Sequence, residues 1–172
     1  LASCLVKDGV FYAFASRFEG GDWNDVTLFK SSDLSNWEQK VIVQQENEHL
    51  FNSSACEGPG GFVLAYESND KAYPGFTTKF ARSDDLETWT KLPDSAFGTN
   101  RYTACPTVRY VNGYYYVLYL ENRQPSHVFE TFVTRPKDLK NWELSSANTV
   151  IAPTGLDEGI NASDSEVVQF DG

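Results

Sequence analysis

The stretch Ser32-Asp33-Leu34-Ser35-Asn36-Trp37 decides the fold, because its Asp-Leu-x-x-Trp core occurs three times in the chain. The second copy is Asp85-Leu86-Glu87-Thr88-Trp89, and the third is Asp138-Leu139-Lys140-Asn141-Trp142. The three tryptophans are 52 and 53 residues apart, and the chain of 172 residues has only four tryptophans. A motif that returns at a constant distance indicates a structural repeat of about 50 residues.

Each repeat carries the same order of short strand candidates around this motif. A glycine opens an aromatic and β-branched run upstream of each motif, and further apolar segments lie before that glycine, before the motif and after the tryptophan. No segment has a helical hydrophobic period. Four short antiparallel strands per repeat are the signature of a β-propeller blade, whereas a β-sandwich has no reason to repeat this motif. The segments are 3–6, 9–14, 26–30 and 38–43, then 53–56, 61–66, 77–81 and 90–92, then 106–111, 113–119, 129–134 and 143–144.

The sequence therefore predicts an all-β fold, a single partial β-propeller domain over residues 1–172. It would hold about three four-stranded blades and the first strand of a fourth, with units at approximately 1–47, 48–97, 98–152 and 153–172. In the fourth unit, only residues 163–172 match the repeat, as the first strand and its glycine. A propeller closes with at least four blades, and an open strand edge invites pairing. We expect a piece of a longer propeller, with self-association through the open blade edge as the alternative.

Charge and composition narrow the class of partner. The net charge of −10 argues against nucleic acid, whose phosphates need a basic surface, and suits a neutral ligand such as a sugar. No apolar run approaches the roughly 18 residues of a membrane span, so no membrane partner is expected. Three cysteines without a C-x-x-C spacing argue against a disulfide framework. Since all three fall on predicted first strands they could converge on zinc, but small side chains packing at a crowded centre is the preferred interpretation, and no metal or cofactor is predicted.

The repeat carries a family resemblance. The Ser-x-Asp-Leu-x-x-Trp turn, preceded by strands such as Gly113-Tyr114-Tyr115-Tyr116, resembles the five-bladed propeller glycoside hydrolases of families 43 and 32 and their relatives. Sialidase Asp boxes read Asp-x-Gly-x-Thr-Trp and fit less well. The resemblance covers nearly the whole chain, and it implies a five-bladed propeller when complete and an oligo- or polysaccharide substrate, hydrolysed by a carboxylate acid and base. A secreted or periplasmic location would suit such an enzyme.

Strand direction separates two sets of loops. Successive strands of a blade are antiparallel, so the glycine turn and the Asp-Leu-x-x-Trp turn share one face, while the loops before the first strand and after the second share the other. This second face varies between repeats, as binding loops do. Its aromatic rings could stack on a sugar, and its polar side chains could hydrogen-bond hydroxyl groups. The predicted substrate-binding residues are Asp22, Trp23, His49, Asn52, Tyr73, Arg101, Tyr102, His127 and Glu158.

Two carboxylates on first strands are the predicted catalytic residues. Glu57, in Ala55-Cys56-Glu57-Gly58-Pro59, is similar to the Glu-x-Pro segment that carries the acid in family 43 and more loosely to Glu-Cys-Pro of family 32. Asp164 lies eight residues before Gly172, a distance comparable to that of the family-43 base, where the other repeats have Leu1, Ser53 and Cys105.

The family pattern is not matched throughout. With Glu57 as the acid, the family's base would lie upstream of Leu1, and Asp164 would fall on the fifth blade, which is not the family's arrangement. A carbohydrate-binding or scaffold propeller without catalysis, or an inactive piece that lacks the base, is therefore the alternative function.

Overall fold

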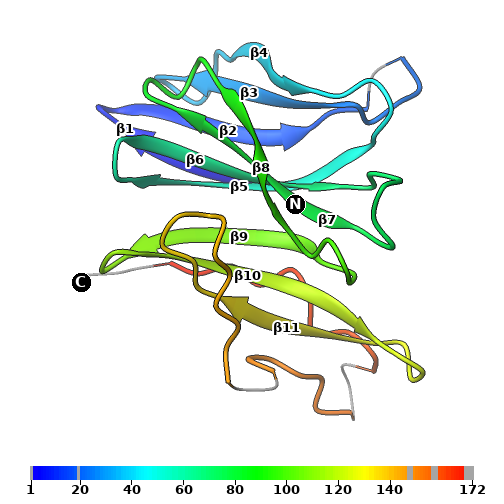
Figure 1. The fold of residues 1–172 in the computed structure, drawn as a ribbon. Coiled ribbons are helices and arrows are strands. Elements are labelled where there is room, and N and C mark those ends of the chain that lie inside the picture. Colours follow the sequence, from blue (N-terminus) through cyan, green and yellow to red (C-terminus); the bar gives the residue numbers. More distant parts are fainter. Residues whose placement is uncertain (1, 19, 147–148, 156–158, 169–172) are drawn as a thin grey trace.

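In the computed structural model, the described residues are 2–18, 20–146, 149–155 and 159–168. They form eleven strands and no helix, arranged as three antiparallel sheets. The sheets follow one another along the chain and stack face against face (Figure 1). We call them blades 1, 2 and 3. The all-β prediction is confirmed.

Within each sheet the strand order is the chain order, as in a propeller blade. Blade 3 has three strands, because the fourth one predicted at 143–144 is reduced to a single bridge between Thr134 and Leu144. The strands are β1 (Ser3–Lys7), β2 (Val10–Ser16), β3 (Asp25–Ser31) and β4 (Glu38–Gln44) in blade 1, β5 (Leu50–Gly58), β6 (Gly61–Ser68), β7 (Thr77–Ser83) and β8 (Thr90–Phe97) in blade 2, and β9 (Ala104–Val111), β10 (Tyr114–Arg123) and β11 (Val128–Thr134) in blade 3.

The turn between the first two strands of blade 2 corrects the predicted alignment of the repeats. Gly60 closes this turn, as Gly9 and Gly113 do in the other blades, and all three have positive φ. Gly61, the glycine aligned from the sequence, is the first residue of β6. Because side chains alternate along a strand, this single residue reverses the assignment of faces in blade 2. Cys4 and Cys56, aligned by the sequence, are accordingly exposed and buried.

Hydroxyl groups at one equivalent position tie the first strands of successive blades together. Ser3, Ser54 and Thr107 each lie six residues before the turn glycine. Ser3 Oγ accepts a hydrogen bond from the Ala55 N–H at 3.1 Å, and Ser54 Oγ accepts one from the Val108 N–H at 3.1 Å. These hydrogen bonds satisfy buried backbone donors between sheets that share no ladder.

The segment after blade 3 lies beside β9 in the same way. Thr107 Oγ1 donates a hydrogen bond to the Ser165 carbonyl at 2.7 Å, and Arg109 Nε donates to the Val167 carbonyl at 3.0 Å. The described residues 159–168 form no strand, so the predicted first strand of a fourth blade is not formed among them. The segment nevertheless runs along β9.

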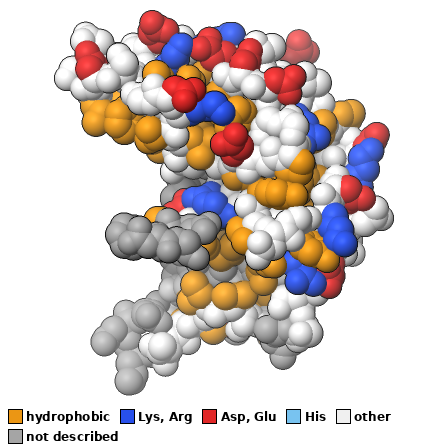
Figure 2. Space-filling model, turned by 90° about the vertical axis from the view of Figure 1, so that its left-hand side faces the viewer, with side chains coloured by type: hydrophobic (Ala, Val, Ile, Leu, Met, Phe, Trp, Pro, Cys, Tyr) orange, Lys and Arg blue, Asp and Glu red, His pale blue; other side chains and the backbone are white. Residues whose placement is uncertain are grey.

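In blades 2 and 3 the Asp-Leu-x-x-Trp turn packs the blade against the one before it. Leu86 is 1% exposed in the core between blades 1 and 2, where the Trp89 ring meets Phe14 edge-on at 5.6 Å. Between blades 2 and 3, the Trp142 ring stacks on Phe80 with ring centroids 5.4 Å apart and lies tilted against Phe97 at 4.8 Å. In blade 1 the equivalent Leu34 and Trp37 are 55% and 44% exposed. Figure 2 shows hydrophobic side chains at the surface of the upper part of the molecule, among many acidic ones.

Candidate functional site at the blade axis

Three residues at equivalent positions of the sequence repeat lie near one another where successive blades adjoin. Asn52 and Cys105 each lie eight residues before a turn glycine, once the turn of blade 2 is placed at Gly60. In the sequence Asp164 lies at the same distance from Gly172, which is outside the described residues. Asn52 Nδ2 donates a hydrogen bond to Cys105 Sγ at 3.2 Å, and the Asp164 carboxylate is near enough to the Cys105 thiol for each to shift the pKa of the other. The structure therefore places two predicted residues, Asn52 and Asp164, near a cysteine that the sequence left out of the site.

A fourth member, Glu67, was missed by the sequence analysis. It lies near the end of β6 and is 3% exposed. Its Oε2 accepts hydrogen bonds from Asn52 Nδ2 at 2.7 Å and from the Cys105 N–H at 2.8 Å. The equivalent residues of the other blades are Ser16 and Leu120, so a carboxylate in an otherwise buried second strand was the signal available. We call Asn52, Glu67, Cys105 and Asp164 the axis cluster.

Two residues of the axis cluster have a left-handed backbone. The φ angles of Cys105 and Asp164 are +50° and +58°, a region that residues other than glycine seldom adopt. The hydrogen bond from the Cys105 N–H to Glu67 holds the first of these conformations in place. Such strained residues are found preferentially at functional sites.

Within the axis cluster, the pKa values of the two carboxyl groups are shifted in opposite directions. Burial raises the pKa of Glu67, and the hydrogen bonds from Cys105 and Asn52 oppose this only in part. A hydrogen bond from Ser163 lowers the pKa of Asp164, with a further contribution from the Cys105 thiol and with burial opposing. Burial, followed by the hydrogen bond and charge of Asp164, raises the pKa of the Cys105 thiol. The exposed Asp164 is therefore the ionised carboxylate of the cluster and Glu67 is the more readily protonated one.

Glu57 lies on β5, at the end of the strand opposite to Asn52. Its side chain is 69% exposed and pairs with Lys7 at 3.4 Å, beside the turn that closes the β5–β6 hairpin. From Asn52 to Glu57 the strand extends about 16 Å, at about 3.3 Å per residue. The structure therefore does not bring Glu57 to Asp164.

A second group of predicted residues lies on the loops of blades 1 and 2. His49 Nε2 is 2.8 Å from Asp22 Oδ1, and the same oxygen accepts a hydrogen bond from the Trp23 N–H. The Trp23 ring is 38% exposed and lies 5.1 Å from the exposed Phe18 ring. Together these residues offer polar atoms and an accessible aromatic face side by side.

A row of aromatic rings connects this group to the axis cluster. Ring centroids follow one another from Trp23 to Phe51 at 6.3 Å, to Phe76 at 5.5 Å and to Tyr102 at 5.4 Å. Burial raises the pKa of Tyr102 to about 12, and the charges of Glu67 and Asp164 add to the effect. The predicted loop face thus gathers Asp22, Trp23, His49, Asn52, Tyr102 and Asp164.

The remaining predicted residues are more dispersed. Tyr73 lines a cavity of about 350 Å³ together with Phe76 and Tyr102. Arg101 pairs with Glu121 at 3.3 Å, and His127 contacts Gln124 within its own hairpin loop. Glu158 lies outside the described residues.

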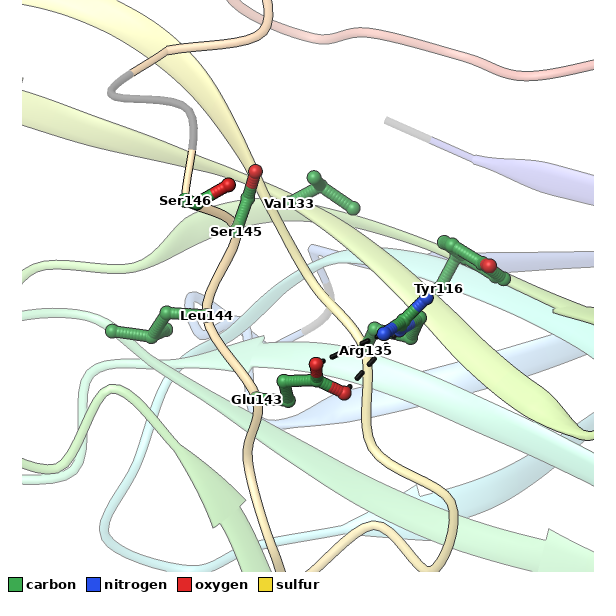
Figure 3. Close-up of a pocket in the computed structure, with 7 residues that line it drawn as sticks. All are labelled: Tyr116, Val133, Arg135, Glu143, Leu144, Ser145 and Ser146. Atoms are coloured by element: carbon green, nitrogen blue, oxygen red, sulfur yellow. Dashed lines mark hydrogen bonds and ion pairs between the residues drawn. The ribbon is translucent and has the colours of Figure 1, made fainter.

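A further cavity, on blade 3, is among those that contain none of the predicted residues. It measures about 300 Å³ and is lined by residues of blade 3, including Tyr116, Val133 and Leu144 (Figure 3). Its charged groups, Arg135 and Glu143, satisfy each other through two hydrogen bonds.

Two properties of the described residues have a bearing on partners. In that part of the chain, no group of three or more His, Cys, Asp or Glu side chains is arranged to hold a metal ion. Nor do the described residues include a helix of the length and hydropathy needed to cross a membrane.

Comparisons with known proteins identify the fold. No protein-family model matches the sequence, and a search of curated proteins finds no match. Among solved structures, one described as a glycoside hydrolase superposes with a TM-score of 0.75 at 20% identity over 98% of this chain. A family-43 α-L-arabinofuranosidase from Clostridium thermocellum gives 0.73 at 13% over 99%, and a family-32 β-fructofuranosidase from Bombyx mori gives 0.70 at 22% over 92%.

The chain has the β-propeller fold of family-43 and family-32 glycoside hydrolases, which confirms the predicted fold and the resemblance. It spans 58%, 57% and 35% of the lengths of these three structures. At such identities the likeness concerns the fold alone.

Proposed function

We propose that this chain belongs to a glycoside hydrolase-like propeller that acts on an oligo- or polysaccharide, with Asp164 as an ionised catalytic carboxylate. The observation that carries the proposal is the axis cluster, in which Asn52, Glu67 and Cys105 are joined by hydrogen bonds beside one exposed carboxylate, that of Asp164. Hydrolysis of a glycosidic bond requires an ionised carboxylate and a protonated carboxyl group on either side of the bond. The lowered pKa of Asp164 suits the first of these roles.

Asp164 would take a proton from the attacking water, or attack the sugar carbon itself, depending on its distance from the second carboxyl group. That distance is about 6.5–9.5 Å for inversion and about 5–5.5 Å for retention. Glu57 is exposed at the far end of β5, which argues against its serving as the partner of Asp164. Glu67 is too deeply buried to reach a sugar oxygen directly.

The loop face would bind the sugar residues. Trp23 offers an exposed ring for stacking on the apolar face of a sugar, and the Asp22–His49 pair lies beside it to bind hydroxyl groups. The aromatic row leads from this point to Tyr102 and the axis cluster. A ligand of several sugar units could therefore contact both groups.

Two conservative substitutions test the proposal in a screen for sugars released from oligo- and polysaccharides. Asp164→Asn keeps the size of the side chain and removes its charge, and it should lower turnover by about 10²–10⁴-fold, the usual contribution of acid–base catalysis. Glu57→Gln is the matched control at the other end of β5 and should leave turnover within about twofold, as surface changes away from a site usually do. Full turnover by Asp164→Asn would refute the assignment.

A carbohydrate-binding propeller without catalysis is the second candidate. It is favoured by two features of the axis cluster. The carboxyl group of Glu67 is buried, and the residue equivalent to Asp164 in blade 3 is a cysteine, Cys105. Calorimetric titration with the same glycans separates the two functions. Binding that Trp23→Ala weakens, without release of sugar, would support this second function.

A further inference from the structure

We infer that Lys79 is a positioning residue, which joins the two loops of blade 2 that carry the predicted sugar-binding residues His49 and Tyr73. The inference deepens the proposed function and rests on it for the role of these loops. The bridge between the loops is a property of the folded chain and can be tested without any ligand.

The first observation is a lysine in a buried strand. Lys79 lies on β7 between Thr78 and Phe80, which are both fully buried, and its own side chain is only 16% exposed. The equivalent positions of the other blades, six residues before the aspartate of the repeated motif, hold Thr27 and Phe132. The repeat therefore does not require a lysine here, and a cation so poorly exposed to water needs anionic partners.

The partners of Lys79 come from two different loops. Its Nζ lies 2.7 Å from Glu48 Oε2 and 2.7 Å from Asp70 Oδ2. Glu48 precedes the first strand of blade 2 and Asp70 follows its second strand, so one ammonium group binds both loops of the predicted binding face. Burial disfavours the charged lysine, but the hydrogen bonds to Asp70 and Glu48 outweigh this and raise the pKa of Lys79. The bridge is therefore formed by a charged lysine in surroundings that strengthen ionic hydrogen bonds.

The residues next to the bridge tie the two loops together through the backbone of His49. The His49 N–H donates a hydrogen bond to Asn69 Oδ1 at 2.7 Å, and the Asn69 N–H donates one to the His49 carbonyl at 3.1 Å. His49 directly follows Glu48, and Asn69 directly precedes Asp70. The histidine whose Nε2 lies 2.8 Å from Asp22 Oδ1 is thus held by the loop pair that Lys79 joins.

Asp70 also shapes the turn that presents Tyr73. Its Oδ1 accepts a hydrogen bond from the Ala72 N–H at 2.9 Å, and its carbonyl accepts one from the Tyr73 N–H at 3.1 Å. The other carboxylate oxygen, Oδ2, is the one that pairs with Lys79. Without the ammonium group, the carboxylates of Glu48 and Asp70 would face each other unpaired, and their repulsion would separate the loops.

Amide hydrogen exchange of the folded, ligand-free chain, followed residue by residue by NMR, tests the bridge. Lys79→Met keeps the length of the side chain and removes its charge. It should speed exchange of the His49 and Asn69 N–H groups about fivefold or more, the effect of losing the net contribution of about one hydrogen bond. Lys30→Met is the matched control, because it removes a lysine on the third strand of blade 1 that pairs with Glu87 at 2.6 Å. It should leave both rates within about twofold of the parent.

Two further measurements separate positioning from a general loss of stability. Lys79→Arg restores a cation with several donors and should bring both exchange rates back to within about threefold of the parent. The Val108 N–H, which donates to Ser54 between blades 2 and 3, should exchange at the parent rate in every variant. The inference fails if Lys79→Met leaves the His49 and Asn69 rates unchanged, or if it speeds Val108 as much as it speeds them.

If Lys79→Met does not fold, Asp70→Asn decides, since it keeps an oxygen for the Ala72 N–H and removes the charge that pairs with Lys79. Faster exchange of the His49 N–H supports the bridge, and an unchanged rate overturns it.

On a glycan that the release screen shows to be hydrolysed, Lys79→Met should raise KM by more than it lowers kcat, because the bridge holds the binding loops and does not contact Asp164. A fall in kcat alone would contradict the inference. The inference and the proposed function fail separately, because full turnover by Asp164→Asn would refute that function while leaving the exchange result standing.

Discussion

The Asp-Leu-x-x-Trp turns of blades 1 and 2 have the same residues at their core and different surroundings. Asp33 and Asp85 make the same local hydrogen bonds, accepting backbone N–H groups two and three residues ahead. Leu34 is 55% exposed, whereas Leu86 is 1% exposed. The aspartate therefore acts within its own turn, while the leucine acts between blades.

This difference separates two structural roles within the repeated motif. Local hydrogen bonds shape every turn alike and need no neighbour. The apolar side chains contribute to stability only where a preceding blade covers them, as blade 1 covers Leu86 and blade 2 covers Leu139. The same motif is thus strongly stabilising in two blades and nearly neutral in the first.

The largest expected effect is the loss of the buried leucine. Leu86→Ala should lower the free energy of unfolding by about 2–5 kcal/mol, the range for large-to-small changes in a core. The equivalent Leu34→Ala should stay within about 0.5 kcal/mol, because its side chain is already half in water. Urea denaturation followed by far-UV circular dichroism measures both. Equal losses in the two variants would contradict the division of roles.

A smaller effect is expected from the hydroxyl groups that tie the first strands together. Ser54→Ala leaves the buried Val108 N–H without its acceptor, which should cost about 1–3 kcal/mol of unfolding free energy. Ser35→Ala, in the exposed turn of blade 1, is the matched control and should stay within about 0.5 kcal/mol. The same urea titrations apply, and a loss for Ser54→Ala no greater than that for Ser35→Ala would show that the hydroxyl bridge is dispensable.

The sequence predicted the blades well because their signal is repeated. Three copies of one motif fixed the number of sheets, the strand order and the end at which the variable loops lie. The turn of blade 2 was displaced by one residue because Gly60 and Gly61 are both glycines and the sequence does not say which closes the turn. That error placed Ser53 where Asn52 belongs in the comparison with Cys105 and Asp164.

The site was only partly predictable, for a different reason. Asn52, Tyr102 and Asp164 were selected from loop position and resemblance, and the structure gathers them. Glu67 was missed because strand periodicity identifies only a buried run. It does not show that Glu67, on the second strand of blade 2, accepts the N–H of Cys105, which lies 38 positions further along the chain. Long-range partners of this kind depend on how blades pack, which a local pattern does not encode.

The smallest expected effect concerns the turn aspartates, and it should be the same in both blades. Backbone hydrogen bonds from Thr88 and Glu87 lower the pKa of Asp85 to about 2, and those from Asn36 and Ser35 hold the pKa of Asp33 well below its usual range. A depressed pKa means that the folded state favours the ionised form. The contribution is therefore complete above about pH 4, the pKa of an unfolded aspartate, and is lost as the pH falls toward 2.

Asp33→Ala and Asp85→Ala should therefore lower the melting temperature by similar small amounts at pH 7, and the difference from the parent should shrink as the pH is lowered through 4. Thermal denaturation at several pH values between 7 and 2.5 measures this. Equal effects in the two blades, beside unequal effects of Leu34→Ala and Leu86→Ala, would separate the local part of the motif from the part that needs a neighbour. A much larger loss for Asp85→Ala would mean instead that the turn hydrogen bonds are coupled to the packing of Leu86, and that the motif acts as one unit.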